Sequence, residues 1–408
     1  MSDDRSSTRY SQDLSAAVGS LFRPLEDDGF WDVDRGTIAR ALEYDTPPGE
    51  GNLDWTPDRR QLWRYGPFAL MGVLYWRRSE RGSPAYDDQI RRALDHATTA
   101  GGEFGAYEEM PSYGLGSLLA AFSMAADVFD DGHYRRHARR VYDRALPLRP
   151  GHNEDVLLVY GATFFYEATG DDAVCAALSA AVDAFVDAVD EDGLIVFDDD
   201  DAGWSKGSSV LTTVYDVLYG GSRPRRHQNQ MYALWALCRA CAVTNRTDAL
   251  DVAEGVLDHT VDHRLRGDGA FVWEDVSTTA RVRGAVLSRL GLRTPHWKFL
   301  YACHQTFFVN AVAHYEAAGG ERDYGPAVRA AMGWLYGENV RGENLVDASG
   351  IGVPMRQMTT DGGMDEPDQM YKGTYEIGSH VMALTNLLSD ADGMTTTPSA
   401  RDTELPSP

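Results

Sequence analysis

The chain has 408 residues, with 38 Lys and Arg against 62 Asp and Glu, a formal net charge of −24 and a sequence pI near 4.7. A surface this acidic repels phosphate backbones, so we expect no nucleic-acid partner. An apolar fraction of 43% and an aromatic fraction of 11% exclude a disordered acidic chain. Four cysteines are too few for a disulfide scaffold.

The excess of acid is spread along the chain, and arginine is strongly preferred to lysine, which occurs only at positions 206, 298 and 372. Together these features resemble proteins of halophiles that accumulate salt. Molar salt shortens the Debye length to about 3 Å and removes most of the self-repulsion. We therefore expect the charge to reflect the solvent more than the substrate. An ordinary acidic cytosolic enzyme is the alternative.

The start of the chain shows no targeting pattern. The first 14 residues lack a basic stretch followed by an apolar one, so no signal peptide is predicted. The longest apolar run, 65–76, is shorter than the roughly 20 residues that cross a bilayer. We expect a cytoplasmic protein with one domain over residues 1–390 and a disordered tail over 391–408.

Helical periodicity dominates the sequence, and two kinds of helix alternate. Six segments are apolar on all sides and are expected to form a buried inner ring: about 60–79, 112–129, 153–169, 227–244, 297–317 and 368–388. Five have one charged face and are expected to lie outside that ring: about 84–99, 132–145, 172–189, 247–263 and 322–336. A helix at about 10–22 is expected to supply the sixth outer position. The pattern predicts an all-α (α/α)6 toroid with short β-hairpin-like segments in its long loops.

The connections between helices differ in length. Short turns with Gly or Asn join each inner helix to its outer partner, whereas long segments such as 190–226 and 264–295 lead to the next inner helix. Both long segments contain short strand-like runs, 193–197 and 269–273. Long loops inside a compact domain are usually functional, and these gather where the inner helices begin.

Six helical hairpins with polar residues at the N-terminal ends of apolar inner helices resemble the six-hairpin glycosidase superfamily. That superfamily includes unsaturated glucuronyl hydrolases, endoglucanases and sugar 2-epimerases, and related toroids include polysaccharide lyases. Residues 334–339, WLYGEN, loosely resemble a late helix end in cellulase-type toroids. The resemblance implies a saccharide substrate bound in the mouth, by which we mean the N-terminal ends of the inner helices. It does not fix the reaction.

Four carboxylates near the predicted mouth are candidates for acid–base or nucleophilic catalysis: Glu108, Glu109, Asp155 and Glu376. An acid in a first helical turn also serves as a cap, which is the alternative for Asp155. Glu376 falls in the middle of an expected apolar helix, where an isolated carboxylate is costly; a buried structural hydrogen bond is its alternative.

Residues of the kinds that bind sugars gather at the same ends. His227 and His304 occur at matching places of two inner helices, each followed by Gln. The candidates for substrate binding are Arg60, Trp63, Tyr113, Asn153, His227, Gln228, His304, Gln305 and Tyr375. Arginines near the mouth suit a uronate or sulfated sugar because guanidinium binds such groups through two hydrogen bonds.

These residues predict a glycoside hydrolase that acts on an anionic saccharide by carboxylate catalysis. A lyase or an epimerase that uses His and Tyr is the first alternative, and a non-catalytic toroid that binds a glycan or a protein is the second. We predict no cofactor and no metal site, since the C-x2-C at 238–241 lies within a helix without a second pair. The arginines of 135–144 are expected to pair with acids on a solvated face. The oligomeric state is not predicted.

Overall fold

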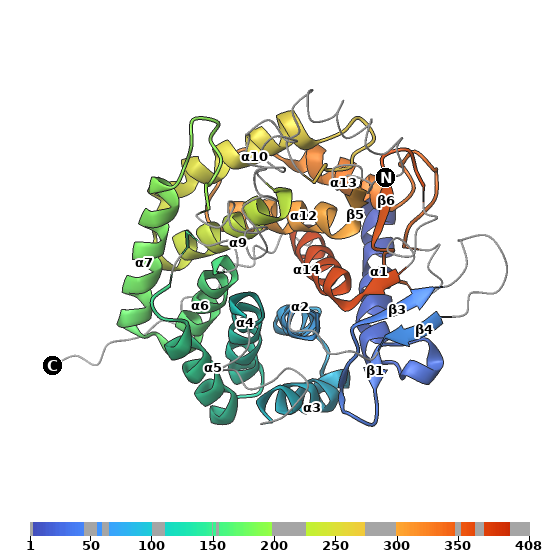
Figure 1. The fold of residues 1–408 in the computed structure, drawn as a ribbon, viewed down its shortest axis with the longest axis horizontal. Helices are drawn as coiled ribbons and strands as arrows, with labels where there is room; N and C mark the ends of the chain where they lie inside the picture. Colours follow the sequence, from blue (N-terminus) through green and yellow to red (C-terminus); the bar gives the residue numbers. More distant parts are fainter. Residues whose placement is uncertain are drawn as a thin grey trace, which may run out of the picture.

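The computed structural model describes residues 3–44, 55–58, 65–99, 111–148, 150–151, 155–197, 226–273, 299–346, 352–363 and 371–391. Seen down the short axis, the helices form two concentric rings (Figure 1). The all-α prediction is therefore confirmed for the described part of the chain. The expected tail over 391–408 lies outside it, apart from residue 391.

The inner ring consists of the six helices that are apolar on all sides. They are α2 (Gly66–Arg78), α4 (Ser112–Val128), α6 (Val156–Thr169), α9 (His227–Thr244), α12 (Ala302–Ala317) and α14 (Thr374–Ala391). Each packs against the next in this order, and α14 packs against α2, which closes the ring. A helix enclosed in this way has no solvent-facing side, which explains why polar residues are scarce along its length.

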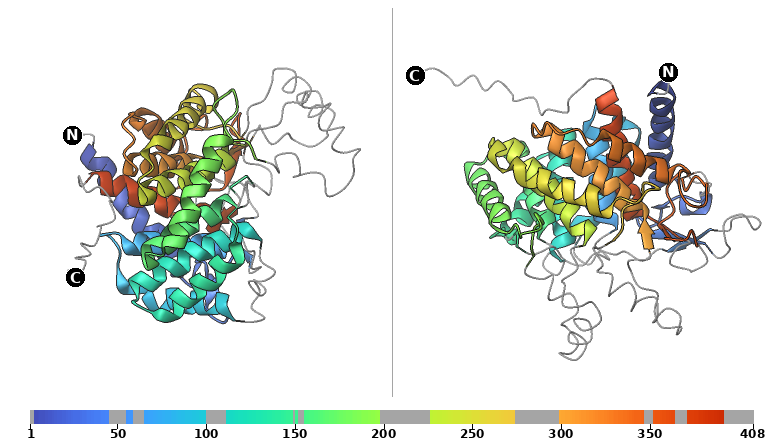
Figure 2. Two further views of the ribbon diagram at one scale, coloured as in Figure 1. Left: turned by 90° about the vertical axis from the view of Figure 1, so that its left-hand side faces the viewer. Right: turned by 90° about the horizontal axis from the view of Figure 1, so that it is seen from above.

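The outer ring holds the helices that have a charged face. They are α3 (Asp87–Thr98), α5 (Gly132–Ala145), α7 (Asp172–Asp187), α10 (Leu250–Arg264) and α13 (Gly325–Leu335). The N-terminal helix α1 (Asp3–Phe22) packs against α14 and supplies the sixth outer position, as predicted, although it is longer than expected. The side views in Figure 2 show α1 along the outside of the ring.

Local sequence signals set several helix ends. Gly170 and Asn245 take the left-handed conformation directly after α6 and α9, with φ of 63° and 56°. The side chains of Asp131 and Asp171 cap α5 and α7 by accepting backbone hydrogen bonds. These turns reverse the chain between an inner helix and its outer partner.

Glycine allows the closest approaches between inner helices. A Cβ atom added to Gly116 of α4 would collide with the backbone of Leu157 in α6, and one added to Gly72 of α2 would collide with Gly378 of α14. Six helices can close into a narrow ring only where some backbones come this near to each other.

Short strands at the mouth were predicted only as the runs 193–197 and 269–273; other strands lie there too, and they shift two helix starts. β7 (Tyr371–Gly373) pairs with β3 (Ala41–Tyr44), which also pairs with β4 (Trp55–Asp58). β5 (Phe299–Tyr301) pairs with β6 (Gln357–Thr359). The fifth and sixth inner helices therefore begin at residues 302 and 374, not at 297 and 368.

The remaining extended segments are small. β1 (Trp31–Asp32) pairs with β2 (Thr37–Ile38), and single bridges join Val189 to Ile195 and Leu265 to Phe271. One residue of each bridge, Ile195 or Phe271, lies in a strand-like run predicted for the long loops. Among the described residues, no helix combines the length and apolar character needed to cross a bilayer.

Candidate functional site at the mouth of the inner ring

The ring order places the predicted site residues around a common end. Tyr65 precedes α2 and Tyr113 is the second residue of α4, while Asp155 precedes α6. His227, His304 and Tyr375 lie in the first turns of α9, α12 and α14. With six helices in this order, α6 is opposite α14 and α4 is opposite α12. The mouth therefore draws its side chains from every inner helix.

Three tyrosine hydroxyls form a chain across the mouth. The hydroxyl of Tyr113 lies 2.6 Å from that of Tyr232 in α9, which in turn hydrogen-bonds to the hydroxyl of Tyr375. All three side chains are buried, and their rings pack around Phe68 of α2 with centroid distances of 6.3, 6.3 and 4.6 Å. Buried hydroxyls need partners, so this chain satisfies polar groups at the centre of an apolar ring.

An acid and a cation meet at the start of α14. Glu376 lies in the first turn, is only 3% exposed, and has its Oε1 atom 3.7 Å from Nε of Arg356. The other carboxylate oxygen lies close to Gly373, where no Cβ atom would fit. The expectation that Glu376 sits in the middle of a helix was wrong, because β7 occupies residues 371–373.

Two aromatic rings surround the cation. The guanidinium carbon of Arg356 is 4.7 Å from the ring centroid of Tyr371 and 5.7 Å from that of Tyr301. Burial lowers the pKa of Arg356, but the neighbouring Tyr371 and Glu376 raise it, and the net shift is upward. Burial, and then the Glu376 charge, raise the pKa of Tyr371. Arg356 is therefore a permanent cation beside Glu376, and Tyr371 keeps its proton.

A second tyrosine pair borders this acid and cation. The hydroxyls of Tyr65 and Tyr371 are 2.8 Å apart, and the guanidinium of Arg40 lies 4.9 and 5.3 Å from the two ring centroids. Arg40 also forms an ion pair with Asp58 of β4. The sheet β4–β3–β7 thus brings a cation from the N-terminal region to the mouth.

The two predicted histidines are neighbours. The ring centroids of His227 and His304 are 5.1 Å apart, and Nε2 of His227 donates to the backbone oxygen of His304 over 3.1 Å. Trp273 and Tyr301 each pack 5.0 Å from the His304 ring. In the described part of the chain, neither ring nitrogen of His304 has a hydrogen-bond partner.

Both histidines are neutral at pH 7. Burial, and then the charges of His304 and Arg264, hold the pKa of His227 well below its usual value. Burial and the Arg264 charge lower the pKa of His304 to about 3. A neutral imidazole has an unprotonated nitrogen that can accept a proton, but a pKa of about 3 makes His304 a weak base at pH 7.

Two glutamines in the first turns of inner helices, Gln230 of α9 and Gln305 of α12, hold neighbouring loops in place. Oε1 of Gln305 accepts from the backbone nitrogen of Phe271, and its Nε2 donates to the oxygen of Tyr301, both over 3.0 Å. Gln230 makes the equivalent pair of hydrogen bonds to the backbone of Ile195, at 3.0 and 2.7 Å. Both amides are fully buried. Gln228 lies two residues before Gln230, in the first turn of α9, and is partly exposed.

Asp155 lies directly before α6, and its backbone oxygen accepts from Leu158 and Val159. It occupies the N-cap position of α6, but its side chain makes no capping hydrogen bond. Glu108, Glu109, Arg60, Trp63 and Asn153 lie outside the described residues.

The side chains of this site that were not among the sequence candidates include Tyr232, Tyr301, Arg40 and Arg356. Tyr232 lies five residues after the start of the apolar helix α9. A buried hydroxyl needs a hydrogen-bond partner, and this was the one sequence feature that could have identified it. The other three depend on strands that pair over long sequence distances, which no local pattern reveals.

No family model matches the chain, and no curated protein is similar to it in sequence. Solved structures are similar in fold. An inactive variant of an α-1,6-mannanase of glycoside hydrolase family 76 from Salegentibacter sp., in complex with an α-1,6-mannotetraose, aligns with a TM-score of 0.59 and 12% identity over 94% of this chain and 99% of that one. A cellobiose 2-epimerase from Bacillus thermoamylovorans aligns with a TM-score of 0.62 and 11% identity over 92% and 98%.

An unsaturated glucuronyl hydrolase specific for heparin aligns with a TM-score of 0.58 and 11% identity, over 95% of this chain and 99% of that one. The chain therefore has the (α/α)6 toroid fold of the six-hairpin glycosidase-like proteins. Identities this low leave its particular family and reaction to be argued from the site.

Proposed function

We propose that the protein is a carbohydrate-active enzyme that hydrolyses a glycosidic bond in an anionic saccharide bound at the mouth. The similar structures support the saccharide class, since they include a mannanase, a glucuronyl hydrolase and a sugar epimerase. The observation that carries the proposal is the pair formed by the buried Glu376 at the start of α14 and the partly exposed Arg356. A carboxylate in that position is expensive to bury unless it has a use or a partner.

The cation determines the role we assign to this carboxylate. Arg356 places a positive charge 3.7 Å from the Glu376 carboxylate. Glu376 therefore suits the base or nucleophile of glycoside cleavage, whereas the leaving oxygen needs a proton donor. Asp155 precedes α6 on the opposite side of the ring and is our candidate for that donor, with Glu108 and Glu109 as further candidates.

Charged and aromatic groups supply the substrate contacts of the proposal. Arg40 and Arg60 are candidates for pairing with a uronate carboxylate. The rings of Trp273 and Tyr301, with Trp63, would stack against sugar faces. The hydroxyl chain of Tyr113, Tyr232 and Tyr375 would hydrogen-bond to sugar hydroxyls near the ring axis.

A second candidate function follows from the histidines. Two neutral imidazoles whose rings are 5.1 Å apart can remove and return a proton, as an epimerase or a lyase requires. In that case the His227–His304 pair would be essential and Glu376 would only hold Arg356 in place.

Proton NMR in heavy water separates these reactions on one panel of substrates. The panel pairs unsaturated and saturated oligouronides with neutral β-linked and α-mannosyl oligosaccharides of equal length. The proposal predicts new reducing ends from the uronides and little from the neutral sugars. Deuterium gained at a sugar carbon without cleavage would indicate an epimerase, and a new double bond would indicate a lyase. Turnover of the neutral sugars alone would contradict the uronate specificity.

A further inference from the structure

The outer helix α5 is basic in a chain whose net charge is −24. Its sequence, GHYRRHARRVYDRA, contains five arginines, two histidines and one acid, Asp143. This concentration of positive charge is opposite in sign to the net charge of the chain. The sequence predicted that these arginines pair with neighbouring acids, and the structure shows this for only part of the set.

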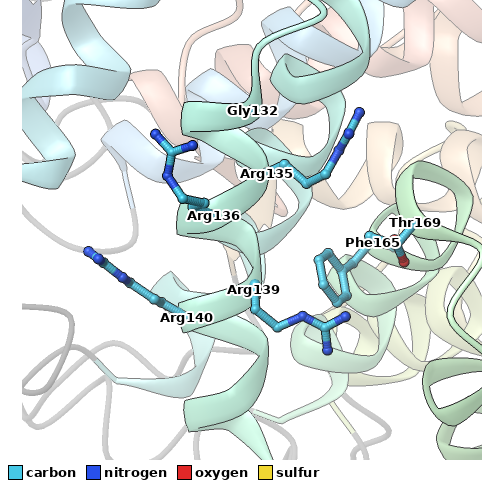
Figure 3. Close-up of a pocket in the computed structure, with 7 residues that line it drawn as sticks. All are labelled: Gly132, Arg135, Arg136, Arg139, Arg140, Phe165 and Thr169. Carbon is cyan, nitrogen blue, oxygen red and sulfur yellow. The ribbon is translucent and has the colours of Figure 1, made fainter.

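A pocket of about 380 Å³ lies between α5 and the end of α6. It is lined by Gly132, Arg135, Arg136, Arg139, Arg140, Phe165 and Thr169, and we call it the arginine pocket. Figure 3 shows Arg139 running to Phe165, Arg135 leaving the same side of α5 but pointing away from Phe165, and Arg136 and Arg140 projecting from the other side of α5. Its volume falls within the range of about 300–1,000 Å³ that is usual for ligand sites.

One arginine of the pocket is fixed and three are available. Arg139 bonds to Asp171 over 2.5 Å, and its guanidinium lies 4.7 Å from the ring centroid of Phe165. Across the described ranges of the chain, no carboxylate lies within ion-pair distance of Arg135, Arg136 or Arg140.

The spacing of these arginines creates repulsion. Arg135 and Arg139 are four residues apart, as are Arg136 and Arg140, so like charges face each other along the helix. After burial and the His133 charge, the charges of Arg140 and Arg136 lower the pKa of His137 to about 4. A bound anion would relieve this repulsion, and guanidinium groups one turn apart, roughly 5.4 Å, suit a ligand that carries repeated negative charges.

The pocket is separate from the mouth. Phe165 and Thr169 lie in the last part of α6, whereas the mouth lies at its first residue, Val156. At 1.5 Å per residue the two sites are roughly 14–20 Å apart along the helix axis. A ligand in the arginine pocket would therefore not touch the proposed catalytic groups.

We propose that the arginine pocket binds the carboxylate or sulfate groups of an anionic saccharide chain at a site distinct from the mouth. The choice of a saccharide rests on the proposed function, whereas the choice of a multiply charged anion rests on the arginines alone. The arginine stems offer apolar surface beneath the guanidinium groups, and a sugar ring with charged substituents matches both features.

Isothermal titration of the full-length protein with an oligogalacturonate tests the inference. The triple variant R135Q/R136Q/R140Q should bind about tenfold more weakly than the unaltered protein. R135K/R136K/R140K should recover only part of the affinity, because lysine lacks the bidentate geometry. R329Q, which removes an exposed arginine from the outer helix α13, is the matched control and should bind normally. Circular dichroism and thermal unfolding establish that each variant is folded.

Three results would overturn the inference. Equal affinity of the triple variant and the unaltered protein would do so, as would equally tight binding of a neutral oligosaccharide. Binding of inorganic sulfate as tightly as the oligogalacturonate would reject a saccharide chain in favour of a simple oxyanion site. Turnover of a short unsaturated uronide, which occupies the mouth alone, should be unchanged in the triple variant. If the unaltered protein does not turn over this uronide, the proposed function is contradicted, but the binding measured at the arginine pocket still stands.

Discussion

The Oε1 atom of Glu376 lies 3.7 Å from Nε of Arg356. This pair joins the start of the last inner helix, α14, to the residue directly before β6. Glu376 is 3% exposed, so its charge depends on nearby groups and not on water. The pair links the fold of the mouth to its proposed chemistry, because the cation compensates a carboxylate that would be costly to bury alone.

Loss of the cation should destabilise the protein. R356M leaves the buried Glu376 carboxylate without this charge, and we expect the free energy of unfolding to fall by about 3 kcal/mol. The double variant E376Q/R356M should be more stable than R356M, because it removes the uncompensated charge. Urea unfolding of the two variants and of E376Q completes the cycle. Additive effects of the two substitutions would show that the pair does not interact.

The tyrosine hydroxyl chain should respond most strongly at its centre. Y232F removes the hydroxyl that contacts both Tyr113 and Tyr375, whereas Y113F and Y375F each break one of those hydrogen bonds. We expect Y232F to lower the free energy of unfolding by about 1–3 kcal/mol and each outer variant by less. Urea unfolding provides the values, and a smaller effect for Y232F than for Y375F would contradict the central position of Tyr232.

Buried neutral histidines make stability depend on pH. The pKa of His304 is about 3 in the folded protein and near 6.5 when unfolded, so the unfolded state binds the proton first as the pH falls. The titration of His304 therefore costs no stability above about pH 6.5. Between that pH and about 3 it lowers the free energy of unfolding by roughly 1.4 kcal/mol per pH unit.

H304Q should therefore flatten the dependence of the free energy of unfolding on pH between 6.5 and 4. Unfolding in urea at a series of pH values gives the slope for H304Q and for the unaltered protein. An unchanged slope in H304Q would mean that His304 is protonated in the folded protein.

Close packing of the inner helices should tolerate no added methyl group at α4. G116A places a Cβ atom against the backbone of Leu157, and we expect it to destabilise the ring by about 1–3 kcal/mol. G255A in α10 is the control, because its nearest neighbouring atom is 4.0 Å away; it should stabilise the protein by about 0.4–1 kcal/mol. Thermal or urea unfolding compares them, and equal effects would argue against the close approach.

The helix pattern of this fold was accessible to sequence reasoning because enclosed and surface helices differ in composition. The mean apolar character of α4 and α6, without charged residues over most of their length, separated them from the one-faced α5. The starts of α12 and α14 were not accessible. Both follow strands whose partners are distant: β7 pairs with β3, more than 300 residues earlier in the chain.

The site divides in the same way. His227, His304 and Tyr375 could be placed because they open apolar helices at matching positions. Arg356 could not, since it lies in an irregular segment and reaches Glu376 only through tertiary packing. Likewise, a glutamine beside a histidine looked like a ligand for sugar, whereas Gln305 is occupied by the backbone of Phe271 and Tyr301.

The most direct test of the proposed chemistry is the turnover number of E376Q on an oligouronide that the unaltered protein cleaves. The substitution keeps the shape of the side chain and removes its charge, and E321Q on the exposed loop before α13 is the matched control. The account predicts a loss of at least about 10³-fold in kcat for E376Q, with the substrate still bound, and no change for E321Q. Full turnover by E376Q would contradict the assignment of Glu376 as the catalytic carboxylate.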